Sequence, residues 1–136
     1  MPGMDEVEAV LVANQRYYRA FEAADLDSMS AVWEHTPRVV CTHPGWSTLR
    51  GWGQVASSYF ALFQNGMQTQ FLLTEQRPVI LGAAAWVSLD ENLLGDDSGV
   101  TVACINIFVQ SGDEWLMVAH HGSVVHSATG LMSGPA

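Results

Sequence analysis

Two hydrophobic periodicities divide the chain near residue 67. Before that point apolar side chains recur every three or four positions, which is typical of amphipathic helices. After it they follow a period of two and are rich in β-branched residues, which is typical of strands. The pattern predicts helices at residues 5–23, between Asp25 and Pro37, and at 54–64. It predicts strands at residues 38–43, 68–76, 79–92, 100–111 and 114–125.

The ends of these elements have local signals. Asp5, with Glu8 three residues later, is a plausible acidic capping box, and Asp25 is expected to cap the second helix. Pro78 is expected to separate the first two long strands, and residues 111–113 to form a tight turn. Residues 1–126 are therefore interpreted as one domain, and the small, polar residues 127–136 as a flexible tail.

Helices followed by a run of antiparallel strands favour an α+β fold. The strand at residues 100–111 is apolar on both sides. One side carries Thr101, Ala103, Ile105, Ile107 and Val109, and the other carries Val102, Cys104, Asn106 and Phe108. Because an apolar sheet face is normally covered, the second face predicts a homodimer.

Composition excludes several partners. Five Lys and Arg against fourteen Asp and Glu give a net charge of −9, so nucleic acid and anionic membranes are not expected to bind. No apolar run reaches ~20 residues, which predicts no membrane span. The acidic N-terminus does not resemble a signal peptide. Cys41 and Cys104 lie in apolar runs and are interpreted as buried free thiols, in keeping with a cytoplasmic location.

Three local motifs make the chain similar to the SnoaL-like branch of the nuclear-transport-factor-2-like (NTF2-like) superfamily. They are Ala24-Asp25-Leu26-Asp27, the segment from Val39 to Trp46 followed by Leu49-Arg50-Gly51, and the closing strand from Trp115 to Ser123. The resemblance extends over residues 5–125. It implies a cone-shaped α+β barrel in which three N-terminal helices pack on a strongly bent antiparallel sheet. The fold would enclose a pocket and commonly forms homodimers.

The resemblance leaves the activity open, because the superfamily includes isomerases, dehydratases, cyclases and non-enzymatic modules. Its isomerase chemistry implies a carboxylate base and an oxyanion hole of a tyrosine and a protonated aspartate. Tyr17 or Tyr18 could supply the phenol and Asp90 a strand carboxylate. No second strand acid is evident, since residues 100–111 contain none.

Histidines are the candidate acid/base groups, because their ordinary pKa of about 6.5 is close to neutrality. His43 ends a short strand and is predicted to face the pocket with a lowered pKa; the alternative is a packed structural ring with one nitrogen bound to the backbone. His120 and His121 are adjacent on one strand, so one faces inward and the other outward. The register of Trp115, Met117 and Ala119 favours His121 as the inward one.

Asp90 alternates with Trp86, Ser88 and Asn92 on one strand face. If that face is inward, a desolvated carboxylate suited to proton transfer results; if outward, the series is a solvated strand end. No metal is expected, because Cys41, His43, His120 and His121 show no ligand-spacing motif and the adjacent histidines diverge.

Aromatic and amide side chains complete the candidate site. Trp46 and Trp52 are predicted at the pocket mouth, and Trp33 could serve the core or the ligand site. The full set of predicted ligand-binding residues is Tyr17, Tyr18, Trp33, Trp46, Trp52, Tyr59, Trp86 and Asn106.

Two functional hypotheses follow. The first is a cofactor-independent enzyme that isomerises, dehydrates or cyclises a small hydrophobic molecule, with His43, His121 and Asp90 as catalytic residues. The second is a non-catalytic ligand-binding or dimerisation module. A titratable pair inside the cavity would favour the enzyme.

Overall fold

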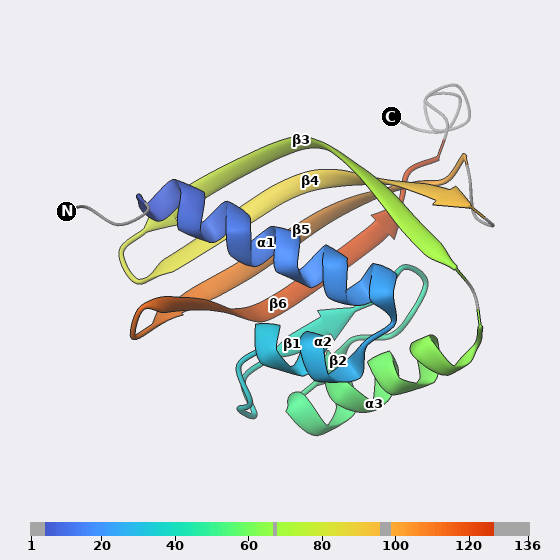
Figure 1. The fold of residues 1–136 in the computed structure, drawn as a ribbon, viewed down its shortest axis with the longest axis horizontal. Helices are drawn as coiled ribbons and strands as arrows, with labels where there is room; N and C mark the ends of the chain where they lie inside the picture. The colour runs from blue at the N-terminus through green and yellow to red at the C-terminus, as the bar shows by residue number, and fades with distance from the viewer. Residues whose placement is uncertain (1–4, 67, 96–98, 127–136) are drawn as a thin grey trace, which may run out of the picture.

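The computed structural model describes residues 5–66, 68–95 and 99–126 (Figure 1). The helices are α1 (Glu6–Ala23), α2 (Leu26–Val32) and α3 (Trp52–Gln64). The strands are β1 (Val40–Thr42), β2 (Leu49–Arg50), β3 (Thr69–Leu81), β4 (Ala84–Gly95), β5 (Thr101–Ser111) and β6 (Glu114–Val124). Residues 127–136, for which a flexible tail is predicted, lie outside the described residues.

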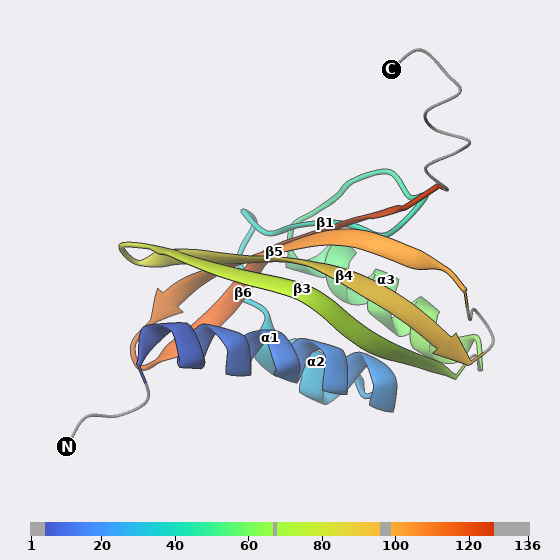
Figure 2. The same cartoon turned by 90° about the horizontal axis from the view of Figure 1, so that it is seen from above.

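The strands form one curved sheet in the order β2-β1-β6-β5-β4-β3. The predicted α+β class is confirmed, and α1 lies across one face of the sheet (Figures 1 and 2). All neighbouring strands are antiparallel except β1 and β6, which pair in parallel and so depart from the predicted antiparallel pattern. A bulge between Thr74 and Arg77, with Glu75 at φ 57°, interrupts the edge strand β3.

The helix starts agree with the capping signals. The Asp5 carboxylate accepts a hydrogen bond from the backbone N–H of Glu8 at 2.9 Å. Asp25 accepts from the backbone of Asp27 at 3.1 Å and from the Ser28 hydroxyl at 2.7 Å. The bonds from the Glu8 and Asp27 backbone satisfy N–H groups that a helix leaves unpaired in its first turn.

The predicted break at Pro78 is wrong. Strand β3 continues through Pro78, which pairs with Val87 of β4, and the chain reverses at Gly82, where φ is 63°. Because β3 is an edge strand, the missing N–H of proline can face away from the sheet without breaking a ladder bond. Strand β2, which was not predicted, is a two-residue partner of β1.

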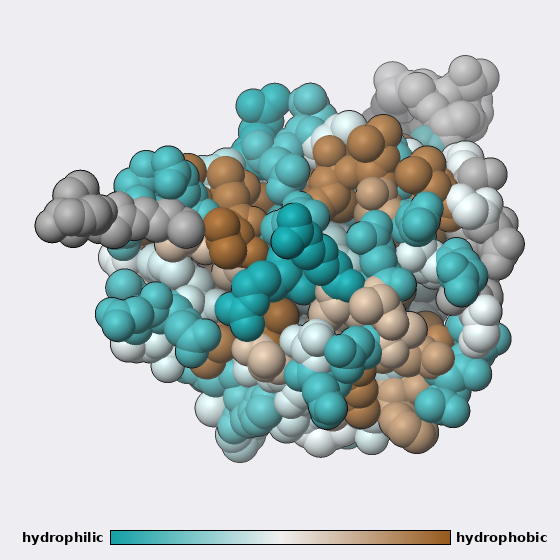
Figure 3. Space-filling view, viewed as in Figure 1, coloured by the Kyte–Doolittle hydropathy of each residue, from teal (hydrophilic) through white to brown (hydrophobic). Residues whose placement is uncertain are grey.

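The core lies between the helices and one face of the sheet. Its largest fully buried side chains include Trp33, Tyr17, Tyr18, Tyr59 and Phe108. The side of α1 that faces away from the core presents a largely hydrophilic surface (Figure 3). Among the described residues, no helix combines the length and apolar character needed to cross a bilayer.

Only one face of β5 is covered by the helices. Val102, Cys104, Asn106 and Phe108 are buried, whereas Ile105 on the opposite face is 36% exposed. Both faces are apolar, as the sequence indicates, and the outer face is uncovered in the single chain.

Candidate ligand pocket

A cavity of about 220 Å³ opens between the helices and the inner face of the sheet. Its lining comes from helices, strands and loops: Tyr17, Phe21, Ala24, His43, Pro44, Trp46, Leu62, Phe63, Asn65, Thr69, Phe71, Glu91, Leu93, Val102 and His120. The volume is below the range of roughly 300–1,000 Å³ usual for drug-sized ligands. The pocket therefore suits a single-ring molecule better than a polycyclic one.

His43 follows β1, lines this cavity and is 3% exposed. Its Nε2 lies 2.9 Å from the Ser58 hydroxyl, which itself donates to the Val55 carbonyl at 2.7 Å. Because the serine proton is used there, His43 Nε2–H is the donor to Ser58. Burial lowers the pKa of His43 to about 4, in the direction predicted, so its ring is neutral near pH 7.

His120, not His121, faces the cavity. His120 is 4% exposed and lines the pocket, whereas His121 is exposed. The predicted orientation is wrong because β6 contains a bulge: Ile107 pairs with Ala119 while Phe108 pairs with Met117, which leaves Val118 as an extra residue. A bulge shifts the alternation of side chains between the two faces by one residue. His120 therefore lies on the same face as Met117, and both are buried.

His120 is held tightly on its inner edge. Its Nδ1 lies 2.6 Å from Oδ1 of Asn106, and its ring stacks on Tyr17 with centroids 5.0 Å apart. Burial, reinforced by the charges of His43 and His121, lowers the pKa of His120 to about 3. Both pocket histidines are therefore neutral hydrogen-bonding groups at neutral pH.

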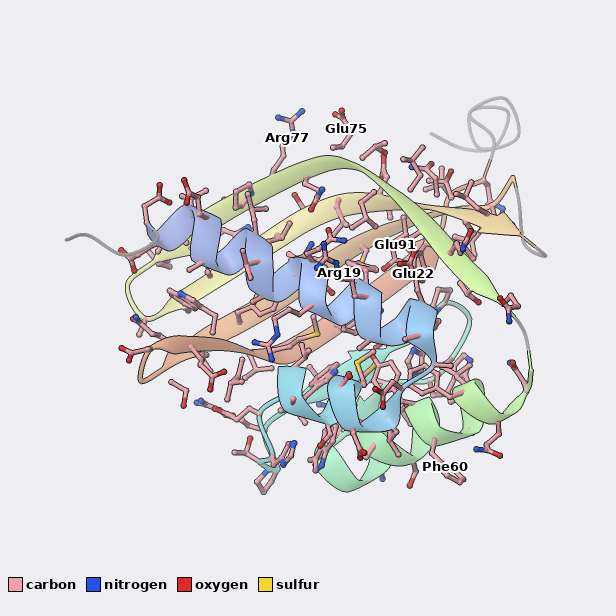
Figure 4. The ribbon with its side chains drawn as sticks, in the orientation of Figure 1. Arg19, Glu22, Phe60, Glu75, Arg77 and Glu91 are labelled. Carbon is pink, nitrogen blue, oxygen red and sulfur yellow. The ribbon has the colours of Figure 1, made fainter. Side chains whose placement is uncertain are left out.

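The acid in the cavity is Glu91, which sequence reasoning missed. The inner face of β4 carries Ala85, Val87, Leu89 and Glu91, all buried. Asp90 is half-buried on the opposite face together with Trp86, so the inward alternative for Asp90 is wrong. The signal in the sequence was the acidic residue at the end of that apolar alternating series. Figure 4 shows Glu91 behind α1, whereas Glu75 and Arg77 point outward from β3.

Burial raises the pKa of Glu91 to about 6, although hydrogen bonds from Tyr18 and Cys104 oppose the rise. The Tyr18 hydroxyl donates to Oε2 of Glu91 at 2.6 Å and lies 3.0 Å from Nδ2 of Asn106. The carboxyl group thus titrates close to neutrality in a site that largely excludes water, which is a property of acid/base residues.

Two tyrosine hydroxyls form a second buried pair. Tyr17 on α1 and Tyr59 on α3 have their hydroxyl oxygens 2.7 Å apart, and Tyr17 lines the cavity. Burial raises the pKa of both phenols well above the ordinary value, so both stay protonated and one hydroxyl donates to the other.

The tryptophans are dispersed. Trp46 lines the cavity and is 42% exposed, which places it at the mouth. Trp52 does not line the cavity: it stacks on His35 with centroids 4.5 Å apart, so its predicted place at the mouth is wrong. Trp33 is buried in the core, and Trp86 lies on the outer face of β4.

Glu91, Cys104 and His120 have potential metal-ligating atoms within 4.8 Å of one another. Hydrogen bonds already join these groups to Tyr18 and Asn106. Burial raises the pKa of the Cys104 thiol, so a metal would have to displace a strongly held proton and break these bonds. Neither cysteine is in a disulfide, and both are buried, as predicted.

Comparisons with known proteins agree with this architecture. A protein from Streptomyces avermitilis, described as a candidate dehydratase of the NTF2-like family, is 34% identical with a TM-score of 0.83, over 90% of this chain and 97% of its own. A candidate calcium/calmodulin-dependent protein kinase type II association domain from Thiobacillus denitrificans is 28% identical, with a TM-score of 0.79 over 93% and 100% of the two chains.

A plant protein is also similar. The F-box protein SKIP8 of Arabidopsis thaliana is 26% identical over 117 residues, which is 86% of this chain and 50% of the plant protein. This chain therefore spans half the length of that relative. A SnoaL-like domain profile matches residues 10–127, which is most of the chain. From its curved sheet, its helices and this match, the chain belongs to the SnoaL-like domain family with the NTF2-like fold.

Proposed function

We propose that the protein is a cofactor-independent enzyme that moves a proton on a small, largely apolar molecule, in an isomerisation, dehydration or cyclisation. The observation that carries this proposal is Glu91, a buried carboxyl group with a pKa of about 6 that faces the same cavity as His120. Keeping an acid in an apolar cavity opposes folding, and such groups cluster at functional sites. The Streptomyces relative described as a candidate dehydratase supports the same class of reaction.

Glu91 takes the acid/base role that the sequence predicts for His43, His121 and Asp90; of these three, His43 lines the cavity and the other two face away from it. Oε2 of Glu91 accepts a hydrogen bond from the Tyr18 hydroxyl, so Oε1 is the oxygen that receives the proton from the substrate. In an isomerisation the carboxyl group returns this proton to another carbon. In a dehydration Glu91 takes the proton from one carbon, the C–O bond on the neighbouring carbon breaks, and the hydroxyl group departs as water with the proton that Glu91 had taken.

The remaining pocket groups orient the substrate. The Tyr17 hydroxyl, backed by Tyr59, is placed to donate a hydrogen bond to a polar substituent. His43 and the exposed rim residue Trp46, with ring centroids 4.9 Å apart, border the opening. Aromatic walls of this kind bind an apolar ring and leave its polar group to the few polar side chains.

A Glu91→Gln variant tests the proposal. Single-ring alcohols and ketones are incubated with the protein, and loss of water or migration of a double bond is followed by NMR. A substrate turned over by the wild type should be converted about 10²–10⁴-fold more slowly by Glu91→Gln, because the general base is lost. Asp90→Asn, which changes the neighbouring residue on the outer face, is the control and should keep full activity. Equal rates for Glu91→Gln and wild type would disprove the role of Glu91.

We also propose that the chain forms a homodimer through the outer face of the sheet. Residues paired across neighbouring strands share a face, and two adjacent rows there are apolar. One row is Val79, Trp86, Ile107 and Ala119; the next is Leu81, Ala84, Val109 and Leu116. Val79 and Leu81 are 40% and 68% exposed in the single chain, so this face has apolar surface to bury.

Size-exclusion chromatography with light scattering should give a mass twice the 14.8 kDa of the chain. Ile105→Glu, on the same outer face, should shift the protein to monomer, because a stable interface of about 1,200–2,000 Å² does not tolerate an unpaired buried charge. Phe60→Glu is the matched control: Phe60 is 54% exposed on α3 and points away from the sheet (Figure 4). A monomeric wild type at micromolar concentration would contradict the prediction.

A further inference from the structure

A chain of side-chain amides runs from the cavity through the core. His120 Nδ1 lies 2.6 Å from Asn106 Oδ1, and Asn106 Nδ2 lies 2.8 Å from Asn14 Oδ1. Asn14 Nδ2 then reaches Gln76 Oε1 at 3.3 Å. Asn14 and Asn106 are fully buried, so water does not compete for the bond between them. In each asparagine of this hydrogen-bonded series the amide nitrogen lies toward the Gln76 end and the amide oxygen toward the His120 end. Together the amides fix the orientation of the His120 ring.

The direction of this chain follows from the Glu91 carboxylate. A carboxylate can only accept, so the Tyr18 hydroxyl donates to Glu91 Oε2 and must accept from Asn106. The Asn106 amide nitrogen therefore faces Tyr18 and Asn14, and its oxygen faces His120. An amide oxygen can only accept, which places the proton of the neutral imidazole on His120 Nδ1 and the lone pair on Nε2.

Nε2 of His120, the nitrogen with the lone pair, lies on the edge of the ring that faces the cavity. His120 lines the pocket, whereas Asn106, which holds Nδ1, is absent from the lining. Among residues 5–66, 68–95 and 99–126, Nε2 of His120 makes no hydrogen bond. His120 Nε2 is thus an acceptor that lacks a donor among the described residues, on a ring that lines the same cavity as Glu91.

We propose that Asn14 and Asn106 hold His120 as a dedicated hydrogen-bond acceptor, so that the cavity selects a small ring bearing a hydroxyl group over the corresponding ketone. A hydroxyl group donates to His120 Nε2, and it can also accept from Tyr17. A ketone of the same shape cannot donate, and it leaves the histidine lone pair unpaired. The proposal deepens the proposed function by naming the class of ligand for the same pocket, and it rests on that function only for the choice of site.

Two measurements on the wild-type protein test the proposal without turnover. Long-range proton–nitrogen NMR should show a protonated Nδ1 and an unprotonated Nε2 on His120. Titration followed by NMR should show cyclohexanol binding about tenfold or more tightly than cyclohexanone, a pair that differs in the ability to donate. A proton on Nε2, or cyclohexanol binding no tighter than cyclohexanone, including no binding of either, would overturn the proposal.

Two variants separate positioning from packing. In Asn106→Leu the preference for the alcohol should largely disappear and both tautomers of His120 should be populated, because the amide oxygen that accepts the proton of Nδ1 is lost. Asn14→Asp keeps an acceptor for Asn106 Nδ2 and should retain the wild-type tautomer and preference. If Asn106→Leu does not fold, the wild-type measurements alone decide. A protein that prefers cyclohexanol but catalyses no reaction would overturn the proposed function and support this inference.

Discussion

Lowering the pH from 8 to 5 is expected to reduce the free energy of unfolding by about 3 kcal/mol. His43 and His120 have pKa values of about 4 and about 3 in the folded protein, both lowered chiefly by burial from the ordinary 6.5. Between these values and 6.5 the unfolded chain binds more protons than the folded one, so stability falls as the pH falls. At pH 5 each histidine accounts for about 2 kcal/mol, and Glu91 offsets about 1 kcal/mol.

Urea unfolding at pH 5, 6, 7 and 8 measures this loss. His43→Gln and His120→Gln should each flatten the pH dependence by about 2 kcal/mol between pH 8 and 5, because glutamine cannot take up the proton. His126→Gln is the matched control, since its side chain is exposed and does not line the cavity. A wild-type stability that is constant over this range would show that the pocket histidines are not buried as neutral rings.

Replacing Glu91 with glutamine is expected to raise the free energy of unfolding at pH 8 by about 2 kcal/mol while it removes the proposed acid/base group. The pKa of Glu91 is raised by burial to about 6 from an ordinary 4.5, so the folded state holds this proton more tightly than the unfolded state. Its contribution favours folding below pH 4.5 and becomes unfavourable as the pH rises through 6. Glutamine is neutral throughout and avoids that cost.

The gain should be confined to neutral and alkaline pH. At pH 4 both the wild-type carboxyl group and its amide replacement are neutral, so the two proteins should have similar stability there. Asp90→Asn, on the outer face of the same strand, should change stability little at either pH. If Glu91→Gln is less stable than wild type at pH 8, the hydrogen bond from Tyr18 to the carboxylate outweighs the desolvation of the charge.

Much of the architecture was determined by the sequence alone. The helical period and the side chains of Asp5 and Asp25 predict α1 and α2, because helix starts depend on residues within one turn. The two-sided apolar pattern of residues 100–111 predicts a sheet with an inner and an outer face. The adjacency of His120 and His121 requires that one ring face inward, since successive strand residues point to opposite sides.

The tertiary structure decided which member of each alternating pair faces the pocket. Strand periodicity sets the alternation but not its phase, and the extra residue at Val118 reversed the phase beyond Met117, so that His120 faces inward. The choice between Asp90 and Glu91 depended on which face of β4 packs against α1, a contact between residues far apart in the sequence. Pro78 remained within β3 because that strand lies at the sheet edge. Position within a sheet is a property of the whole fold, and local residues cannot encode it by themselves.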